Sequence, residues 1–121
     1  MSRPLLDESR VHPAIRDTVE HLHAEVVHNV QAASMSNAVL VVGMSGNPFC
    51  KRARKALDAA AVPHHYLEYG SYLSQWRERL ALKMWSGWPT FPLVFVKGVL
   101  IGGASDLATL IESGELKRLL A

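Results

Sequence analysis

The chain has 121 residues, which suits one compact domain and leaves little room for a second hydrophobic core. Apolar residues make up 49% and charged residues 20%, a balance typical of a folded domain rather than a disordered chain. The formal net charge of +2 is too small to favour a nucleic-acid partner, and no stretch has the length and apolarity of a membrane span. The single cysteine, Cys50, excludes an intramolecular disulfide, a cysteine-rich zinc site and an iron–sulfur site ligated only by protein cysteines.

The chain begins with a polar segment that shows no periodicity. We therefore expect a tail over residues 1–12 and one folded domain over residues 13–121. The first ten residues carry both signs of charge and lack the apolar core of a secretory signal, so the cytoplasm is the expected compartment. From Pro13 to Val30, apolar residues at spacings of three and four predict one amphipathic helix.

A strand, a helix and a second strand follow. The apolar, largely β-branched run at 38–42 is typical of a central strand buried on both faces. Helical spacing over 48–61 and alternation over 65–69 complete a predicted βαβ unit. Further along the chain, one apolar set at helical spacing predicts another amphipathic helix: Leu73, Trp76, Leu80 and Met84.

The last third of the chain predicts a hairpin and closing helical turns. Residues 93–96 and 99–101 flank a Lys97-Gly98 turn, and apolar spacing from 107 to 119 is helical. The predicted class is therefore α/β, with a small mixed four-stranded sheet, helices on both faces and an extra N-terminal helix.

The candidate reactive residues lie between the first predicted strand and the helix that follows it. Asn47 is a favoured helix N-cap and Pro48 suits the first helical position, which places Cys50 in the first turn. The amides and dipole there, with the cations between Lys51 and Lys55, would lower the pKa of an accessible thiol. The alternative interpretation is a small, buried, apolar cysteine beside a solvated basic face.

Two loops complete the candidate site. Thr90, Phe91 and Pro92 lead into the hairpin, and X–Pro frequencies alone favour a trans Phe91–Pro92 bond. The glycines at 102 and 103 precede another helix, whose amides, with Ser105 as the expected cap, could hold a carboxylate.

Together these segments resemble the glutaredoxin family from about residue 39 to the C-terminus. The run Trp88-Pro89-Thr90-Phe91-Pro92, followed by the Gly102-Gly103 turn, is especially similar to the monothiol glutaredoxins. The resemblance implies a thioredoxin-like fold, a cis Phe91–Pro92 bond and glutathione as the bound molecule.

The resemblance also implies individual site residues. The backbone of Phe91, beside Pro92, would hydrogen-bond to glutathione. The turn bearing Gly103, Ser105 and Asp106 would receive its γ-glutamyl group, although many family members have an acid where this chain has Ser105. Arg79 matches a basic residue that faces the glycine carboxylate.

The chain departs from the family at the nucleophile. Dithiol members carry C-P-Y-C, whereas this chain has Asn47-Pro48-Phe49-Cys50, so Asn47 occupies the place of the attacking thiol. Cys50 then matches the resolving cysteine, or the serine of the monothiol C-G-F-S motif. In monothiol members the first cysteine also ligates a [2Fe–2S] cluster, which is therefore not expected here. A rival alignment treats Cys50 as the nucleophile but shifts the helix by one turn.

Two functional hypotheses follow. In the first, this is a glutathione-binding protein whose single thiol, Cys50, undergoes thiol–disulfide exchange or glutathionylation. In the second, it is a catalytically inactive binding or protein-interaction module in which Cys50 is buried. Glutathione and glutathionylated or other proteins are the expected partners. The histidine pairs have spacings that disfavour chelation, so no metal site is predicted, and the tryptophans are expected in the core and at the cleft rim.

Overall fold

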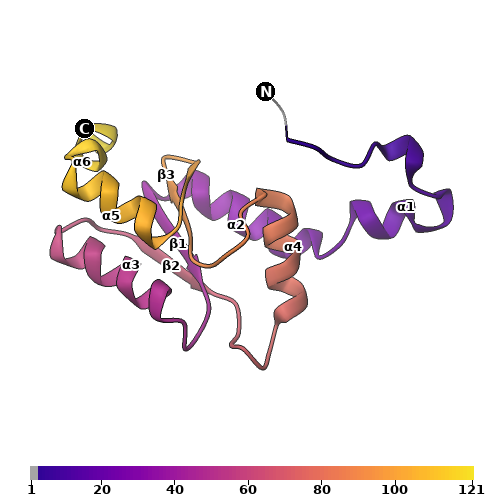
Figure 1. The fold of residues 1–121 in the computed structure, drawn as a ribbon, viewed down its shortest axis with the longest axis horizontal. Helices are drawn as coiled ribbons and strands as arrows, with labels where there is room; N and C mark the ends of the chain where they lie inside the picture. Colours follow the sequence, from indigo (N-terminus) through magenta and orange to yellow (C-terminus); the bar gives the residue numbers. More distant parts are fainter. Residues whose placement is uncertain (1–2) are drawn as a thin grey trace.

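A mixed four-stranded sheet lies at the centre of the fold in the computed structural model, which describes residues 3–121 apart from the side chains of residues 19 and 20 (Figure 1). The strands are β1 (Val39–Gly43), β2 (His65–Glu68), β3 (Leu93–Val96) and β4 (Val99–Gly102). Their order is β2-β1-β3-β4, with β1 parallel to β2 and antiparallel to β3, and β3 antiparallel to β4. The predicted mixed sheet with a central, fully buried first strand is confirmed.

Helices cover both faces of the sheet. They are α1 (Pro13–Glu20), α2 (Ala24–Ser36), α3 (Pro48–Ala59), α4 (Trp76–Ser86), α5 (Ala104–Glu112) and α6 (Glu115–Leu120), preceded by a 3-10 turn at Glu8–Arg10. On one face, α2 and α4 pack over Leu40 and Val42 of β1. On the other, α3 and the C-terminal helices pack over Val39 and Val41. Alternation along β1 therefore supplies both halves of the core.

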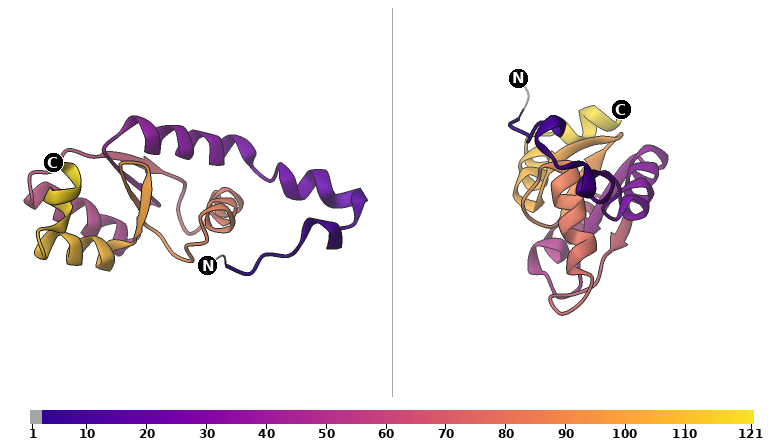
Figure 2. Two further views of the ribbon diagram at one scale, coloured as in Figure 1. Left: turned by 90° about the horizontal axis from the view of Figure 1, so that it is seen from above. Right: turned by 90° about the vertical axis from the view of Figure 1, so that its right-hand side faces the viewer.

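The single N-terminal helix predicted over 13–30 is wrong, because the structure divides it in two. The chain breaks between α1 and α2, where His23 has a left-handed backbone with φ of 47°. An α-helix cannot continue through that conformation. The break allows α2 to lie against the sheet through Val26, Val27 and Val30 while α1 projects from the body, as the left view of Figure 2 shows.

The buried face predicted for α4 is also wrong. Leu73, Trp76, Leu80 and Met84 are exposed, and the helix instead buries Arg79, Ala81 and Leu82. Apolar residues occupy several sides of α4, so their spacing identifies a helix but not the side that meets the sheet. This error leaves an apolar stripe on the surface.

The hairpin predicted for the last two strands, β3 and β4, is confirmed. Lys97 and Gly98, which join β3 to β4, have φ angles of 48° and 82°. Two consecutive residues with positive φ match the right-handed twist of the strands that they connect. No described helix is both long enough and apolar enough to cross a membrane.

Candidate functional site

The first turn of α3 is built around Asn47, as predicted. Its side-chain oxygen accepts hydrogen bonds from the amides of Phe49, at 2.8 Å, and Cys50, at 3.2 Å. Pro48 occupies the first helical position, where its missing N–H costs nothing. The two amides that a thiolate at position 47 would attract are therefore satisfied by the Asn47 amide oxygen.

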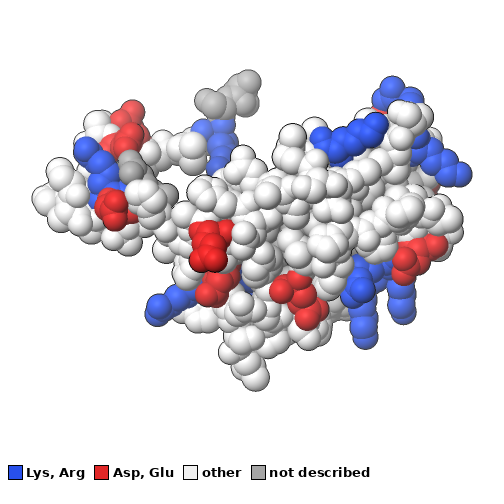
Figure 3. All heavy atoms as spheres, turned by 180° about the vertical axis from the view of Figure 1, so that it is seen from behind, with Lys and Arg blue, Asp and Glu red and all other residues white. Residues whose placement is uncertain are grey.

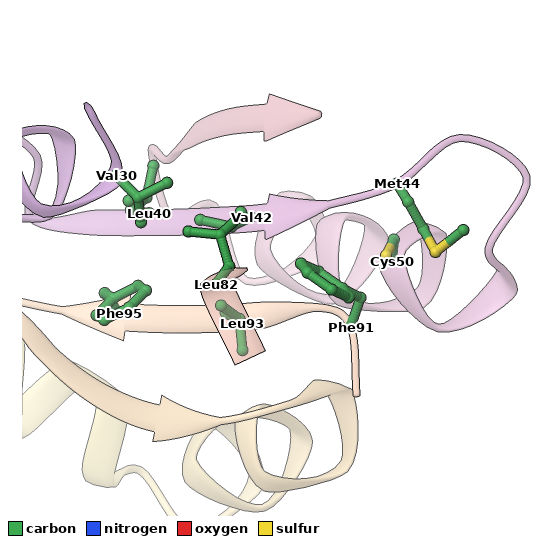
Figure 4. Close-up of a cluster of buried hydrophobic side chains, with 9 residues drawn as sticks. All are labelled: Val30, Leu40, Val42, Met44, Cys50, Leu82, Phe91, Leu93 and Phe95. Atoms are coloured by element: carbon green, nitrogen blue, oxygen red, sulfur yellow. The ribbon is translucent and has the colours of Figure 1, made fainter. Parts of the chain in front are cut away.

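Cys50 lies beneath this turn and not at the surface. Only 2% of the residue is exposed, and it packs in the cluster that contains Met44 and Phe91 (Figure 4). A Cβ added to Gly43 would lie 2.8 Å from the Cys50 sulfur, which shows how closely the thiol approaches β1. Burial raises the pKa of Cys50, against a smaller lowering by a backbone hydrogen bond from Met44. The condition for a lowered pKa, an accessible sulfur, is not met.

The basic residues that follow Cys50 lie on the solvent side of α3. Lys51, Arg52, Arg54 and Lys55 are all exposed, and Lys and Arg side chains gather over α3 at the lower right of Figure 3. The guanidinium of Arg52 lies 5.2 Å from the centre of the Phe49 ring. These cations thus flank the start of the helix without approaching the buried thiol closely enough to offset its burial.

The Phe91–Pro92 bond is cis, as the family resemblance implied and against the general frequency of X–Pro bonds. This bond borders a cavity of about 250 Å³. Its lining comes from the start of α3, the loop before β3 and the start of α5: Phe49, Trp88, Thr90, Phe91, Pro92, Gly103, Ala104, Ser105 and Asp106. Segments that are distant in the sequence therefore meet at one groove.

The start of α5 forms one wall of the cavity. Gly103, and not Ser105, is the N-cap, so the predicted cap is wrong by two positions. The Asp106 carboxylate accepts a hydrogen bond from the Gly103 amide at 3.0 Å and, among the residues that the structure describes, is the only charged side chain of the lining. Ser105 remains exposed within the first helical turn. Amides at such a helix start suit a carboxylate ligand.

Arg79 lies outside this lining. It is 7% exposed, and its guanidinium donates hydrogen bonds to the carbonyl oxygens of Tyr69, at 2.9 Å, and Ser74, at 2.5 Å. These contacts fasten α4 to the loop after β2. The carboxylate contact assigned to Arg79 by resemblance stays a prediction.

Comparisons with known proteins agree with this geometry. The family model described as Glutaredoxin matches residues 39–101. The chain belongs to the glutaredoxin family. A glutaredoxin-like protein of Dictyostelium discoideum is 42% identical over 102 residues, covering 84% of this chain and 83% of that protein. Proteins named monothiol glutaredoxins are among further relatives.

Solved glutaredoxins share the fold. The crystal structure of oxidized glutaredoxin 2 from Chlamydomonas reinhardtii has a TM-score of 0.69 at 31% identity, covering 80% of this chain and 92% of that one. The buckwheat glutaredoxin-glutathione complex has a TM-score of 0.72 at 24% identity, with 84% and 92% covered. The second likeness concerns the fold alone. The thioredoxin-like layout expected from the sequence is thus confirmed.

The glutaredoxin groove includes residues that the sequence interpretation left out of the candidate site. Phe49 and Ala104 line it beside Thr90, Phe91 and Pro92, which the sequence had placed in the candidate site. Each is a direct neighbour, or a near neighbour, of a residue that was predicted. Because these residues belong to the same motifs as the predicted ones, the sequence could have included them. Which residues of a motif face the groove depends on how the three segments meet in the folded protein. Trp88 lines the groove, as expected for a cleft-rim tryptophan.

The residues at the start of α3 do not fit a [2Fe–2S] cluster held by a protein thiolate. Asn47 offers an amide at the place of the family's ligating cysteine, and its oxygen already caps the helix. The thiol of Cys50 is buried with a raised pKa, the opposite of what a ligating thiolate needs. Within residues 3–121, no three histidine, cysteine or acidic side chains gather as a metal site.

Proposed function

We propose that this glutaredoxin-family chain binds glutathione in the groove between the cis Phe91–Pro92 bond and the start of α5, and that Cys50 is not an exchange nucleophile in the native protein. The groove itself carries the proposal, because its lining brings together all the residues of the predicted γ-glutamyl site. Family membership supports glutathione as the ligand class. The buckwheat glutaredoxin of the same fold is a glutathione complex.

The chemistry of the lining suits the two ends of a γ-glutamyl group. The first-turn amides of α5 favour its carboxylate through hydrogen bonds and the helix dipole. The carboxylate of Asp106 suits its ammonium group. Beside the cis proline, the backbone of Phe91 would pair with the peptide part of the ligand. Recognition of this kind requires no protein thiol.

The state of Cys50 supports the binding module over the exchange enzyme. Attack on a disulfide requires an accessible thiolate. The Cys50 sulfur is buried, and its raised pKa favours the protonated thiol. Asn47, at the place of the family nucleophile, has no sulfur to exchange. Binding to glutathionylated or other proteins stays a prediction.

Calorimetric titration of the full chain with reduced glutathione tests the binding step. We expect saturable one-to-one binding that is lost in Ser105→Trp, because the new ring would fill the groove from an exposed position. Thr109→Trp is the matched control, since Thr109 is exposed one turn further along α5 and does not line the groove. No binding by the wild type, or equal loss in both variants, would overturn the proposal.

Intact-mass measurement with oxidised glutathione tests the second step. The native protein should remain unmodified, whereas the denatured protein should gain one glutathione at Cys50. Rapid stoichiometric modification of the native protein would instead assign exchange chemistry to Cys50.

A further inference from the structure

The first turns of α3 carry a cluster of cations that the proposed function does not use. Lys51, Arg52 and Lys55 are exposed, and with Pro48 they line a surface hollow of about 320 Å³. We call these four residues the α3 basic face. Lys51 and Lys55 lie four residues apart, so they share one side of the helix. Figure 3 shows Lys and Arg side chains gathered over α3 at the lower right.

Neither ion pairing nor helix stability accounts for these cations. In the described part of the chain, no carboxylate forms a salt bridge with Lys51, Arg52 or Lys55. The cations lie toward the N-terminal end of α3, whose first turn has no acid and whose last turn has no base. This distribution is the reverse of the one that the helix dipole favours. The α3 basic face therefore lacks an anionic counterpart, which a partner can supply.

The positive charge of the chain is concentrated in α3. This helix has four Lys or Arg residues and one acid, Asp58, so its net positive charge exceeds the +2 of the whole chain. The rest of the chain is therefore slightly negative. A long polyanion such as a nucleic acid would gain little from the surface beyond α3, whereas a short acidic segment would meet cations along most of its length.

The surroundings of the α3 basic face favour a protein segment over a nucleic acid or a lipid surface. The Arg52 guanidinium lies 5.2 Å from the centre of the Phe49 ring, so it occupies a ring face on which a base would stack. A lipid surface takes up apolar side chains beside the cations that it binds, but the exposed apolar residues of α4 lie across the sheet from α3. Phe49 is 48% exposed, which leaves room for one apolar side chain of a partner protein.

We propose that the α3 basic face binds an acidic segment of a partner protein. The carboxylates of the segment pair with Lys51, Arg52 and Lys55, and an apolar side chain among them packs on Phe49. Because Phe49 also lines the glutathione groove, the bound segment borders that groove. The three cations lie outside the described lining of the groove, so this inference does not depend on the proposed function.

Fluorescence anisotropy of the full chain with two short labelled peptides tests the proposal. One peptide is rich in Glu with a central Phe, and in the other Gln replaces each Glu. At low ionic strength we expect the acidic peptide to bind at least about fivefold more tightly, because each exposed ion pair contributes modestly and three act together. The preference should largely disappear at an ionic strength of about 1 M, where the screening length is about 3 Å.

Substitutions on the α3 basic face test which residues are responsible. The double variant Lys51→Gln, Lys55→Gln should bind the acidic peptide at least about threefold more weakly than the wild type. Lys117→Gln is the matched control, since Lys117 is an exposed base on α6, and it should bind as the wild type does. The affinity for reduced glutathione should be the same in all three proteins, which separates this test from that of the groove. Circular dichroism checks that each variant keeps the fold.

Several results would overturn the proposal. Equal binding of both peptides by the wild type would do so, as would an acidic-peptide affinity that the double variant leaves unchanged. Tighter binding of a single-stranded oligothymidylate or of phosphatidylserine vesicles, lost in the double variant, would assign the face to a nucleic acid or a membrane instead. A wild-type dimer that the same two substitutions dissociate would assign it to a second copy of the chain.

Discussion

The cap at Asn47 gives the sharpest stability prediction. Its side-chain oxygen is the acceptor for two first-turn amides, so Asn47→Ala leaves both without a protein partner. Loss of such a cap costs about 1 kcal/mol of unfolding free energy. With an unfolding entropy of about 2.1 cal/mol/K per residue, or roughly 250 cal/mol/K for 121 residues, this corresponds to a fall in Tm of about 4 °C.

Asn47→Asp tests the effect of a negative charge at this position while the cap hydrogen bonds are kept. The carboxylate keeps the two hydrogen bonds and adds a negative charge at the positive end of α3, which should raise the unfolding free energy by about 0.3–1 kcal/mol at neutral pH. Because the folded state lowers the pKa of such a carboxyl, this gain is present above its unfolded pKa and is lost as the pH falls through the folded value.

Differential scanning calorimetry of the wild type and both variants at neutral and acidic pH is the assay. Ser45→Ala, an exposed change just before the turn, is the control and should leave the Tm unchanged. An Asn47→Ala protein as stable as the wild type would refute the assignment of Asn47 as the cap. An Asn47→Asp protein less stable than Asn47→Ala at neutral pH would refute the electrostatic reasoning.

Three further predictions follow from the site. Asn47→Cys places a thiol at the helix start, where amides favour the thiolate, so exchange with a glutathione mixed disulfide should rise more than about tenfold in a spectrophotometric assay. Arg79→Gln removes the donor to two backbone carbonyls and should lower the unfolding free energy in urea by about 1–3 kcal/mol. Because burial raises the pKa of Cys50, the native state keeps that proton longer than the unfolded state. Stability should therefore fall as the pH rises from the usual thiol pKa through the native value, less steeply in Cys50→Ala.

The first two of these have a control variant at the same position or on the same helix. Asn47→Ser keeps the cap without a sulfur and should stay inactive, and equal inactivity of Asn47→Cys would contradict the alignment of position 47 with the family nucleophile. Arg77→Gln, exposed on α4, should change stability by less than about 0.5 kcal/mol. The pKa of Tyr66 is also raised by burial, so part of the alkaline loss should remain in Cys50→Ala, and an unchanged slope would contradict the Cys50 contribution.

Local sequence signals predicted the structure correctly where it depends on residues within one short segment. Asn47 and Pro48 fix where α3 begins, because capping depends on residues within one turn. The apolar run at β1 indicates a central strand, because only a strand covered on both faces tolerates it. The Phe91–Pro92 bond is different, since residue frequencies favoured trans and only the family motif implied cis.

Apolar spacing gave wrong predictions for the buried side of α4 and for the continuity of the helix over 13–30. The spacing of Leu73, Trp76, Leu80 and Met84 is helical, yet α4 turns another side to the sheet. The spacing over 13–30 likewise shows no sign of the break at His23. Periodicity records which residues share a face, but the side that is buried depends on which neighbouring elements arrive to cover it.

The sequence by itself determined the family, the order of helices and strands apart from the break at His23, and the absence of a thiol at position 47, because each depends on residue identity and local spacing. Only the tertiary structure decided that Cys50 is buried, that Arg79 serves two backbone carbonyls, and that nine residues from three segments line one groove. Exposure, pKa and groove shape arise from atoms that are distant along the chain, and those contacts exist only once the sheet and its helices have packed together.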